Sequence, residues 1–308
     1  MPPNDRSPLH DEILEEIRRA GPFASIDELN HRLATRVRAW NARPQADLGG
    51  LSPDQMGELL RGDWNTMGAL RLDEALTLDD VGTAPILVDA RTLLQYVVDH
   101  GPIKQTPAGN LSRRVVQDLL PRLRTAESDQ PFERPPALNE RDVLWLFVLR
   151  HTLLFAKLLV KRRGLVTSKQ GRILLEEPRA GELYALLFRT FFRTFDLRFF
   201  DNNDRHPGLQ PTVAYSFHRL RSDAHDWSTA QELAERAWHP DAKDPPSPSD
   251  MQYGDLRHWS FTHRVVTPLV QFGLLERRPV DPAARRKDYE YRIAPLFNRF
   301  VRFQFGRS

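Results

Sequence analysis

The sequence contains no cysteine, and this single absence excludes several classes of protein. Without thiols there is no disulfide scaffold, no thiolate zinc or iron–sulfur site, and no cysteine nucleophile. Long apolar runs are also missing, since none approaches the roughly 18 residues that a membrane-spanning helix requires. The N-terminus, MPPNDRSPLHDEILEE, is polar and acidic, which does not fit a secretory signal. We therefore expect a cytoplasmic protein that does not enter a membrane.

The common sequence patterns of enzymes are absent as well. There is no Walker phosphate loop, no G-x-G-x-x-G, no G-x-S-x-G and no H-E-x-x-H. His258 and His263 are five residues apart, whereas a spacing of four would place both on one helical face. Asp201, Asp204 and His206 form the densest group of possible metal ligands, but their segment lacks the pattern of a calcium loop. The sequence predicts a protein that is not an enzyme, with no catalytic residue, no metal site and no cofactor.

Charge is present but unevenly distributed along the 308 residues, although the net charge is only +3. Residues 1–90 hold nine Lys/Arg against sixteen Asp/Glu, whereas residues 150–198 and 256–308 each hold eleven against four. Most cations in the two basic blocks are arginine, whose planar guanidinium suits phosphate. Such blocks are typical of a nucleic-acid contact face, and also of ordinary solvated surfaces in an arginine-rich protein.

Helical periodicity dominates the chain. In the N-terminal third it predicts helices over 9–20, from Ser25 to about Asn41, and from Ser52-Pro53 onward. Ser25 with Glu28 three residues later forms a capping-box pattern, and a serine before a first-turn proline is a favoured helix start. Residues 62–85 are expected to be irregular.

The remaining chain repeats one order of elements: helix, short strand, helix, helix, basic hairpin. This is the plan of a winged-helix domain, in which a hairpin closes the open side of a three-helix core. The two copies span 90–100, 103–106, 107–123, 139–159 and a hairpin around Gly164, then 211–222, 228–238, 256–272 and a hairpin over 274–294. We expect a mainly α fold with small β-hairpins, an α+β class. It would comprise an acidic helical region at 1–88 and two winged-helix-like modules at 89–200 and 201–308.

An aromatic helix is expected from Ala180 to about Phe199. Phenylalanines at helical spacing are usually core, so this helix is predicted to pack between the modules. Two alternative functions for this helix remain open. Its aromatic rings could stack on the bases of single-stranded nucleic acid, or residues 180–199 could form a surface for a protein partner or a homodimer.

The first copy also carries a resemblance. IKQTPAGNL, followed by an apolar helix, a basic hairpin and T-S-K-x-G, resembles uncharacterised bacterial proteins of the plasmid open-reading-frame and transposon-passenger kind. The similarity covers about Asp89–Glu177, less than a third of the chain. It implies an architecture and no particular activity.

These patterns predict a non-enzymatic DNA-binding protein, either a transcriptional regulator or a protein associated with a mobile element. In the second copy the third helix would enter the major groove of double-stranded DNA, while both hairpins would contact phosphate. The predicted DNA-contacting residues are Arg257, His258, Ser260, Thr262, His263, Arg264, Arg285, Arg286, Lys287, Lys161, Arg162, Arg163, Lys169 and Arg172. The alternative is a protein-interaction scaffold with winged-helix modules and no role on DNA.

Overall fold

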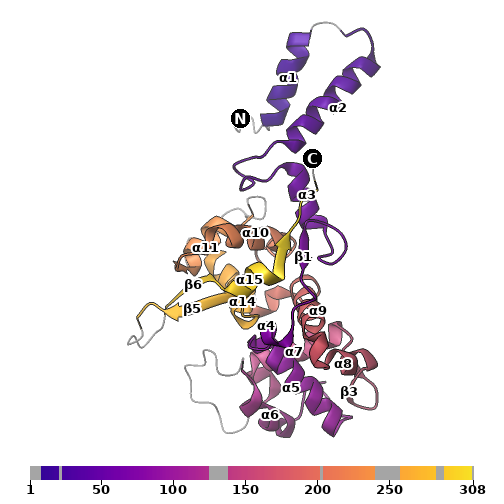
Figure 1. Ribbon diagram of the computed structural model, residues 1–308, viewed down its shortest axis with the longest axis vertical. Helices are drawn as coiled ribbons and strands as arrows, with labels where there is room; N and C mark the ends of the chain where they lie inside the picture. Colours follow the sequence, from indigo (N-terminus) through magenta and orange to yellow (C-terminus); the bar gives the residue numbers. More distant parts are fainter. Residues whose placement is uncertain are drawn as a thin grey trace.

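The computed structural model describes residues 8–20, 23–124, 138–201, 204–239, 257–281 and 288–306. The molecule is elongated, with a helical hairpin projecting at one end and two groups of helices with small sheets below it (Figure 1). No helix within the described residues has the length and apolar character needed to cross a membrane. The predicted class, mainly α with small antiparallel sheets, is confirmed.

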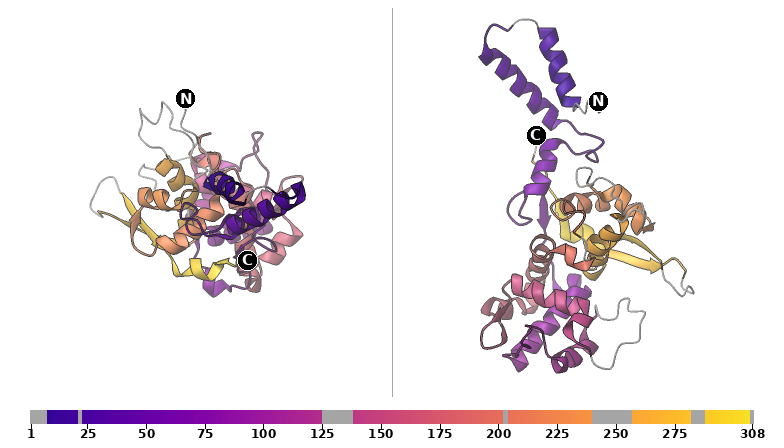
Figure 2. Two further views of the ribbon diagram at one scale, coloured as in Figure 1. Left: turned by 90° about the horizontal axis from the view of Figure 1, so that it is seen from above. Right: turned by 180° about the vertical axis from the view of Figure 1, so that it is seen from behind.

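The projecting hairpin, which we call the arm (residues 8–43), consists of α1 (Pro8–Ala20) and α2 (Ile26–Ala42). Ser25 caps α2 as predicted, because its hydroxyl accepts the Glu28 backbone N–H at 3.1 Å. The two helices run antiparallel and are joined by Glu12, whose carboxylate pairs with Arg36 at 2.8 Å and with Arg43 at 3.1 Å. The arm lies at one end of the molecule, as the right-hand view of Figure 2 shows, and α2 contacts the helix that follows it in sequence.

Below the arm, the chain forms α3 (Pro53–Arg61), β1 (Leu70–Leu72) and α4 (Leu78–Val81). Ser52 caps α3 in a full capping box with Gln55, as the serine–proline pattern predicted. The prediction that residues 62–85 are irregular is confirmed for most of the segment and is wrong for β1 and α4. β1 pairs antiparallel with β7 (Val301–Phe303), so two segments more than 200 residues apart in the sequence lie side by side. Three-residue strands with a distant partner carry no local periodicity, which explains why they were missed.

The first module follows the predicted order. Its elements are α5 (Pro85–His100), α6 (Arg113–Leu119), α7 (Leu144–Phe155), β2 (Leu159–Lys161), β3 (Leu165–Thr167), α8 (Lys169–Leu174) and α9 (Ala180–Arg193), with 3-10 turns at Leu120–Arg122, Glu140–Asp142 and Glu177–Arg179. The expected extended piece is present as an antiparallel bridge between Ile103 and Leu165. The predicted helix start at Thr106 is wrong, because residues 106–110 form a turn and Ser112 caps α6 instead.

The second module also has the predicted order. Its elements are a 3-10 turn (Leu197–Phe200), α10 (Val213–Asp223), β4 (Ser228–Thr229), α11 (Ala230–Ala237), α13 (Arg257–Phe261), a π-helical turn (Thr262–Val266), α14 (Thr267–Gln271), β5 (Leu275–Pro279), β6 (Tyr289–Ile293) and α15 (Pro295–Phe300). The three strands form one antiparallel sheet in the order β4-β6-β5. The cap of α11 is Thr229 with Glu232, one residue later than the predicted Ser228 with Gln231.

The third helix of this module is broken by a π-helical turn, although one continuous helix was predicted over 256–272. Pro268 has no N–H and cannot donate to the carbonyl four residues earlier. The chain widens just before it, where the Thr267 N–H bonds to the Thr262 carbonyl.

A continuous hydrophobic core extends from Leu51 to Val301 and crosses the predicted boundaries at 88 and 200. Its centre is α9, whose Tyr184, Phe188, Phe191 and Phe192 are fully buried. The Phe188 ring contacts rings from distant parts of the sequence, because its centroid lies 6.0 Å from that of Trp64 and 5.3 Å from that of Phe300. The core interpretation of the aromatic helix is confirmed. Base stacking is wrong for these four side chains because none reaches the surface. A surface for a protein partner or a homodimer through 180–199 stays a prediction.

Candidate nucleic-acid interface

The hairpin of the first module presents three consecutive cations. β2 and β3 pair antiparallel, with Lys161 opposite Leu165. Lys161, Arg162 and Arg163 are exposed, while Leu165 is fully buried and anchors the hairpin in the core. The turn requires Gly164, because a Cβ there would lie 2.9 Å from the Ile103 carbonyl oxygen.

The start of α8 is held against the base of this hairpin. The Ser168 N–H donates to the Leu158 carbonyl at 2.9 Å, and the Ser168 hydroxyl caps α8 by accepting the Gly171 N–H at 3.0 Å. A Cβ at Gly171 would lie 2.6 Å from the same Leu158 carbonyl, so this close approach requires glycine. Lys169 and Arg172 are thereby fixed beside the hairpin, and both are exposed.

Two further exposed lysines adjoin this region. Lys104 follows Ile103, which bridges to Leu165, and Lys157 precedes Leu158, which bonds to Ser168. We define the basic hairpin surface by seven exposed residues: Lys104, Lys157, Lys161, Arg162, Arg163, Lys169 and Arg172. Within the described part of the chain, none of the seven forms an ion pair. The sequence explains this for the six that follow Lys104, since no Asp or Glu occurs from residue 143 to residue 175.

The hairpin of the second module is electrostatically different. Arg278 lies opposite Glu290 and pairs with it at 2.8 Å, and Arg292 lies opposite Glu276 and pairs at 2.7 Å. Both guanidinium groups also pack on Trp227, at 4.4 and 4.6 Å from the ring centroid. Two of the three arginines in the stem of this hairpin are therefore neutralised by cross-strand pairs. The third, Arg277, packs on the Tyr289 ring at 4.8 Å from its centroid. The predicted contacts at its tip, Arg285, Arg286 and Lys287, lie outside the described residues.

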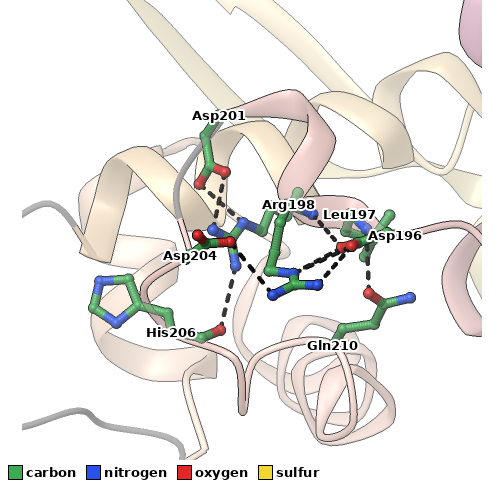
Figure 3. A network of polar contacts seen from close by, with 8 residues as sticks. Asp196, Leu197, Arg198, Asp201, Asp204, His206 and Gln210 are labelled. Carbon is green, nitrogen blue, oxygen red and sulfur yellow. Dashed lines mark hydrogen bonds and ion pairs between the residues drawn. The ribbon is translucent and has the colours of Figure 1, made fainter.

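Two residues predicted to read DNA from the third helix of this module are buried, and that prediction is wrong for them. Ser260 is 0% exposed and Arg264 is 1% exposed. The Arg264 guanidinium forms two hydrogen bonds to the Asp201 carboxylate, both 2.9 Å, and a third to the His206 carbonyl at 3.2 Å. This arginine connects the helix to the preceding loop, and Figure 3 shows its two partners in that loop, Asp201 and His206.

Other predicted residues on the same helix are partly occupied by local contacts. The Thr262 hydroxyl donates to the His258 carbonyl at 2.6 Å, and His263 Nδ1 lies 2.8 Å from the Trp259 carbonyl oxygen. Arg257 is half-buried, and His258 is exposed. This helix presents far less free positive charge than the sequence suggested.

The first module contains a second buried ion pair that sequence reasoning missed. Arg150 on α7 pairs with Glu140, and the two side chains are 1% and 0% exposed. Glu140 also accepts the Leu111 backbone N–H at 2.8 Å. A signal was available, because Arg150 is the only Asp, Glu, Lys or Arg within the apolar stretch of α7, LWLFVLRHTLLF. A lone charge of that kind is usually paired.

The acidic loop residues singled out as possible metal ligands are bound to arginines instead. Asp201 holds Arg264, and Arg198 pairs with Asp196 at 2.7 Å and with Asp204 at 3.4 Å (Figure 3). Hydrogen bonds from the Arg198 side chain lower the pKa of Asp196. In the ranges that the structure covers, no group of three or more His, Asp or Glu side chains is arranged to hold a metal.

Comparison with known proteins adds one finding. No curated protein and no solved structure matches the chain. A family model does match part of it, overlapping the Asp89–Glu177 segment of the sequence resemblance and containing the whole basic hairpin surface. Residues 82–180, about a third of the chain, are similar to the family described as the Y4jL N-terminal domain.

Proposed function

We propose that this chain is a non-enzymatic DNA-binding protein whose basic hairpin surface contacts the phosphates of double-stranded DNA. The observation that carries the proposal is the set of seven exposed cations with no ion pair among the described residues. Free cations can neutralise phosphates without first breaking internal ion pairs, and each contact releases counterions from the duplex. The arginines add a planar fork that fits phosphate oxygens.

The proposed contact is made by the hairpin rather than by a helix in the groove. α7, the third helix of the first module, packs against α5 and α9, and Trp145 on α7 stacks against Phe191 at 6.2 Å. Phosphate contacts fix position and carry little sequence information. We therefore expect weak sequence preference from this surface, which suits a mobile-element-associated protein better than a highly selective regulator.

Assignment of both modules to the winged-helix class is part of this proposal. The order of elements, the bridge from Ile103 to the β2–β3 hairpin, and the β4-β6-β5 sheet of the second module support it. The tip residues Arg285, Arg286 and Lys287 stay in the proposal on sequence grounds, as a second contact.

The test is titration of a fluorescent DNA duplex at several salt concentrations, with fluorescence anisotropy as the readout. The full chain is compared with three triple alanine variants: Lys161/Arg162/Arg163, Arg285/Arg286/Lys287, and Arg277/Arg278/Arg292 as a matched control with the same loss of formal charge. Loss of three phosphate contacts should reduce the negative log–log salt slope by up to about 3. We expect that loss for the first variant, a smaller one for the second, and little change for the control.

Two results would overturn the proposal. The first is the absence of salt-dependent binding by the full chain at low ionic strength, which would favour the scaffold alternative. The second is equal weakening by the first variant and the control, which would indicate non-local electrostatics rather than a hairpin contact. Light scattering with and without duplex separates these cases, because a scaffold keeps its mass when DNA is added.

A further inference from the structure

The arm is the one part of the described chain in which no side chain is buried. From residue 11 to residue 50 every described side chain is at least partly exposed, and the first buried residue is Leu51. Among the arm residues whose side chains the structure describes, none belongs to the hydrophobic core or to the partly buried set packed against it. Two helices of 13 and 17 residues are too short to be stable without tertiary packing of their apolar faces.

The apolar residues of the arm nevertheless form a pattern of core type. Leu29, Leu33, Val37 and Trp40 recur at helical spacing on α2, and Ile13, Leu14 and Ile17 do so on α1. Each of these seven is only half-buried, and Ile26 at the start of α2 is 76% exposed. The pair of helices covers one side of its apolar seam and leaves the other side to solvent.

The charges of the arm are balanced and ordered. Residues 8–43 contain six Asp/Glu and six Arg, so the arm has zero net charge, unlike the basic modules. Each helix begins acidic and ends basic: α1 has its acids at 11–16 and its arginines at 18 and 19, and α2 has its acids at 27 and 28 and its arginines from 32 onward. A second arm placed antiparallel by a two-fold axis would set each acidic half against a basic half.

We propose that the arm is a dimerisation element in which two copies of this chain pack arm against arm as an antiparallel four-helix bundle. A second copy satisfies both features, because it buries the open side of the seam and matches the charge order. Zero net charge gives no attraction for a polyanion, and identical arms do not repel each other. The arm projects from the end of the molecule opposite α8 and β3, so dimerisation leaves both basic hairpin surfaces accessible (Figure 1).

The experiment uses charge reversal in the full chain, with mass measured by light scattering after size exclusion. One variant carries Arg18→Glu and Arg38→Glu, and the other carries Glu15→Lys and Asp27→Lys; all four residues are exposed. In each variant two reversals give the arm a net charge of magnitude four, negative in the first and positive in the second. The control is Arg61→Glu on α3, an exposed arginine outside the arm. Circular dichroism checks that helix content is retained.

We expect the unmodified chain and the control to be dimers, each reversed variant alone to be a monomer, and an equimolar mixture of the two variants to regain dimer mass. Three results would overturn the proposal: a monomeric unmodified chain, a dimer that both variants leave intact, or a mixture that stays monomeric. DNA binding is measured separately, so the arm proposal and the DNA proposal can fail independently.

Discussion

The two hairpins look alike in sequence and differ in the structure. Both are short antiparallel pairs rich in arginine or lysine, and both follow the third helix of their module. In β5–β6 the register places Glu276 and Glu290 directly across from arginines, so two of the three arginines in the stem are paired internally. In β2–β3 the strands are three residues long and contain no acid. Counting cations therefore overstates how many of them in the second hairpin are available to bind phosphate. The cross-strand register decides which cations are paired and which are free.

The third helix of each module likewise carries an arginine that is paired internally, here at a buried position. Each module has an arginine on its third helix that is 1% exposed, Arg150 or Arg264, and each is paired with a carboxylate that precedes it in sequence. These arginines attach the helix to the preceding segment. An arginine on a helix beside a basic hairpin can thus be an internal anchor rather than a nucleic-acid contact.

The largest expected effect comes from removing one of these anchors. Arg264→Met should lower the free energy of unfolding by about 3–5 kcal/mol, because it leaves the Asp201 carboxylate buried without its partner. Arg150→Met should lower the free energy of unfolding by a similar amount, because it leaves the Glu140 carboxylate buried without its partner. Denaturant unfolding measures both, with Arg278→Met as the control for an exposed pair, where we expect a loss below about 1 kcal/mol.

One result for Arg264→Met would contradict its role as an internal anchor. A variant with unchanged stability and weakened DNA binding would mean that Arg264 leaves its buried pair to contact the duplex, as the sequence originally suggested.

A gain of function should follow from releasing the paired arginines of the second hairpin. Glu276→Gln together with Glu290→Gln removes both cross-strand partners, and frees Arg292 and Arg278 to contact phosphate. We expect DNA affinity at low salt to rise about tenfold, with a steeper salt dependence. Anisotropy titration measures the change, and Glu176→Gln with Glu177→Gln, two exposed acids near α8, serves as the matched control.

An equal gain from the control pair would indicate that overall charge, and not the hairpin pairs, limits binding. No gain from either pair would mean that the second hairpin does not reach the duplex.

Local signals in the sequence were sufficient for much of the fold. The caps at Ser25, Ser52 and Ser168 were predicted correctly because a cap depends on residues three positions apart. The order of helices and hairpins in both modules follows from periodicity and from turns such as Gly164. The aromatic helix was recognised as core because its phenylalanines recur at helical spacing.

Features that depend on distant partners were not predictable in this way. The β1–β7 pairing joins Leu70–Leu72 to the C-terminus, and the orientation of Arg264 is set by Asp201, 63 residues earlier. The π-helical turn before Pro268 was not predicted, and Ser260 is buried although it was placed on the polar edge of the third helix. The free cations of the first hairpin did have a signal in the sequence, the absence of Asp and Glu from residue 143 to residue 175, which a count of basic residues alone does not show.

The smallest expected effect concerns two histidines, one in each module. Burial lowers the pKa of His151 on α7 and of His218 on α10 below the usual 6.5. The unfolded chain then takes up these protons first as the pH falls, so stability should decrease from neutral pH down to the depressed folded values. His151→Gln and His218→Gln should each flatten part of that decrease, measured as unfolding free energy against pH.

DNA should distinguish the two histidines. The positive charge of Lys161 contributes to the lowered pKa of His151, whereas no residue of the basic hairpin surface contributes to that of His218. Phosphate bound at Lys161 would offset its charge, so a saturating duplex should raise the pKa of His151 and leave that of His218 unchanged. Histidine titration by NMR, with and without DNA, measures both shifts in one sample. Equal shifts of the two pKa values would place the duplex away from the first hairpin, because only a local anion acts on one module and not the other.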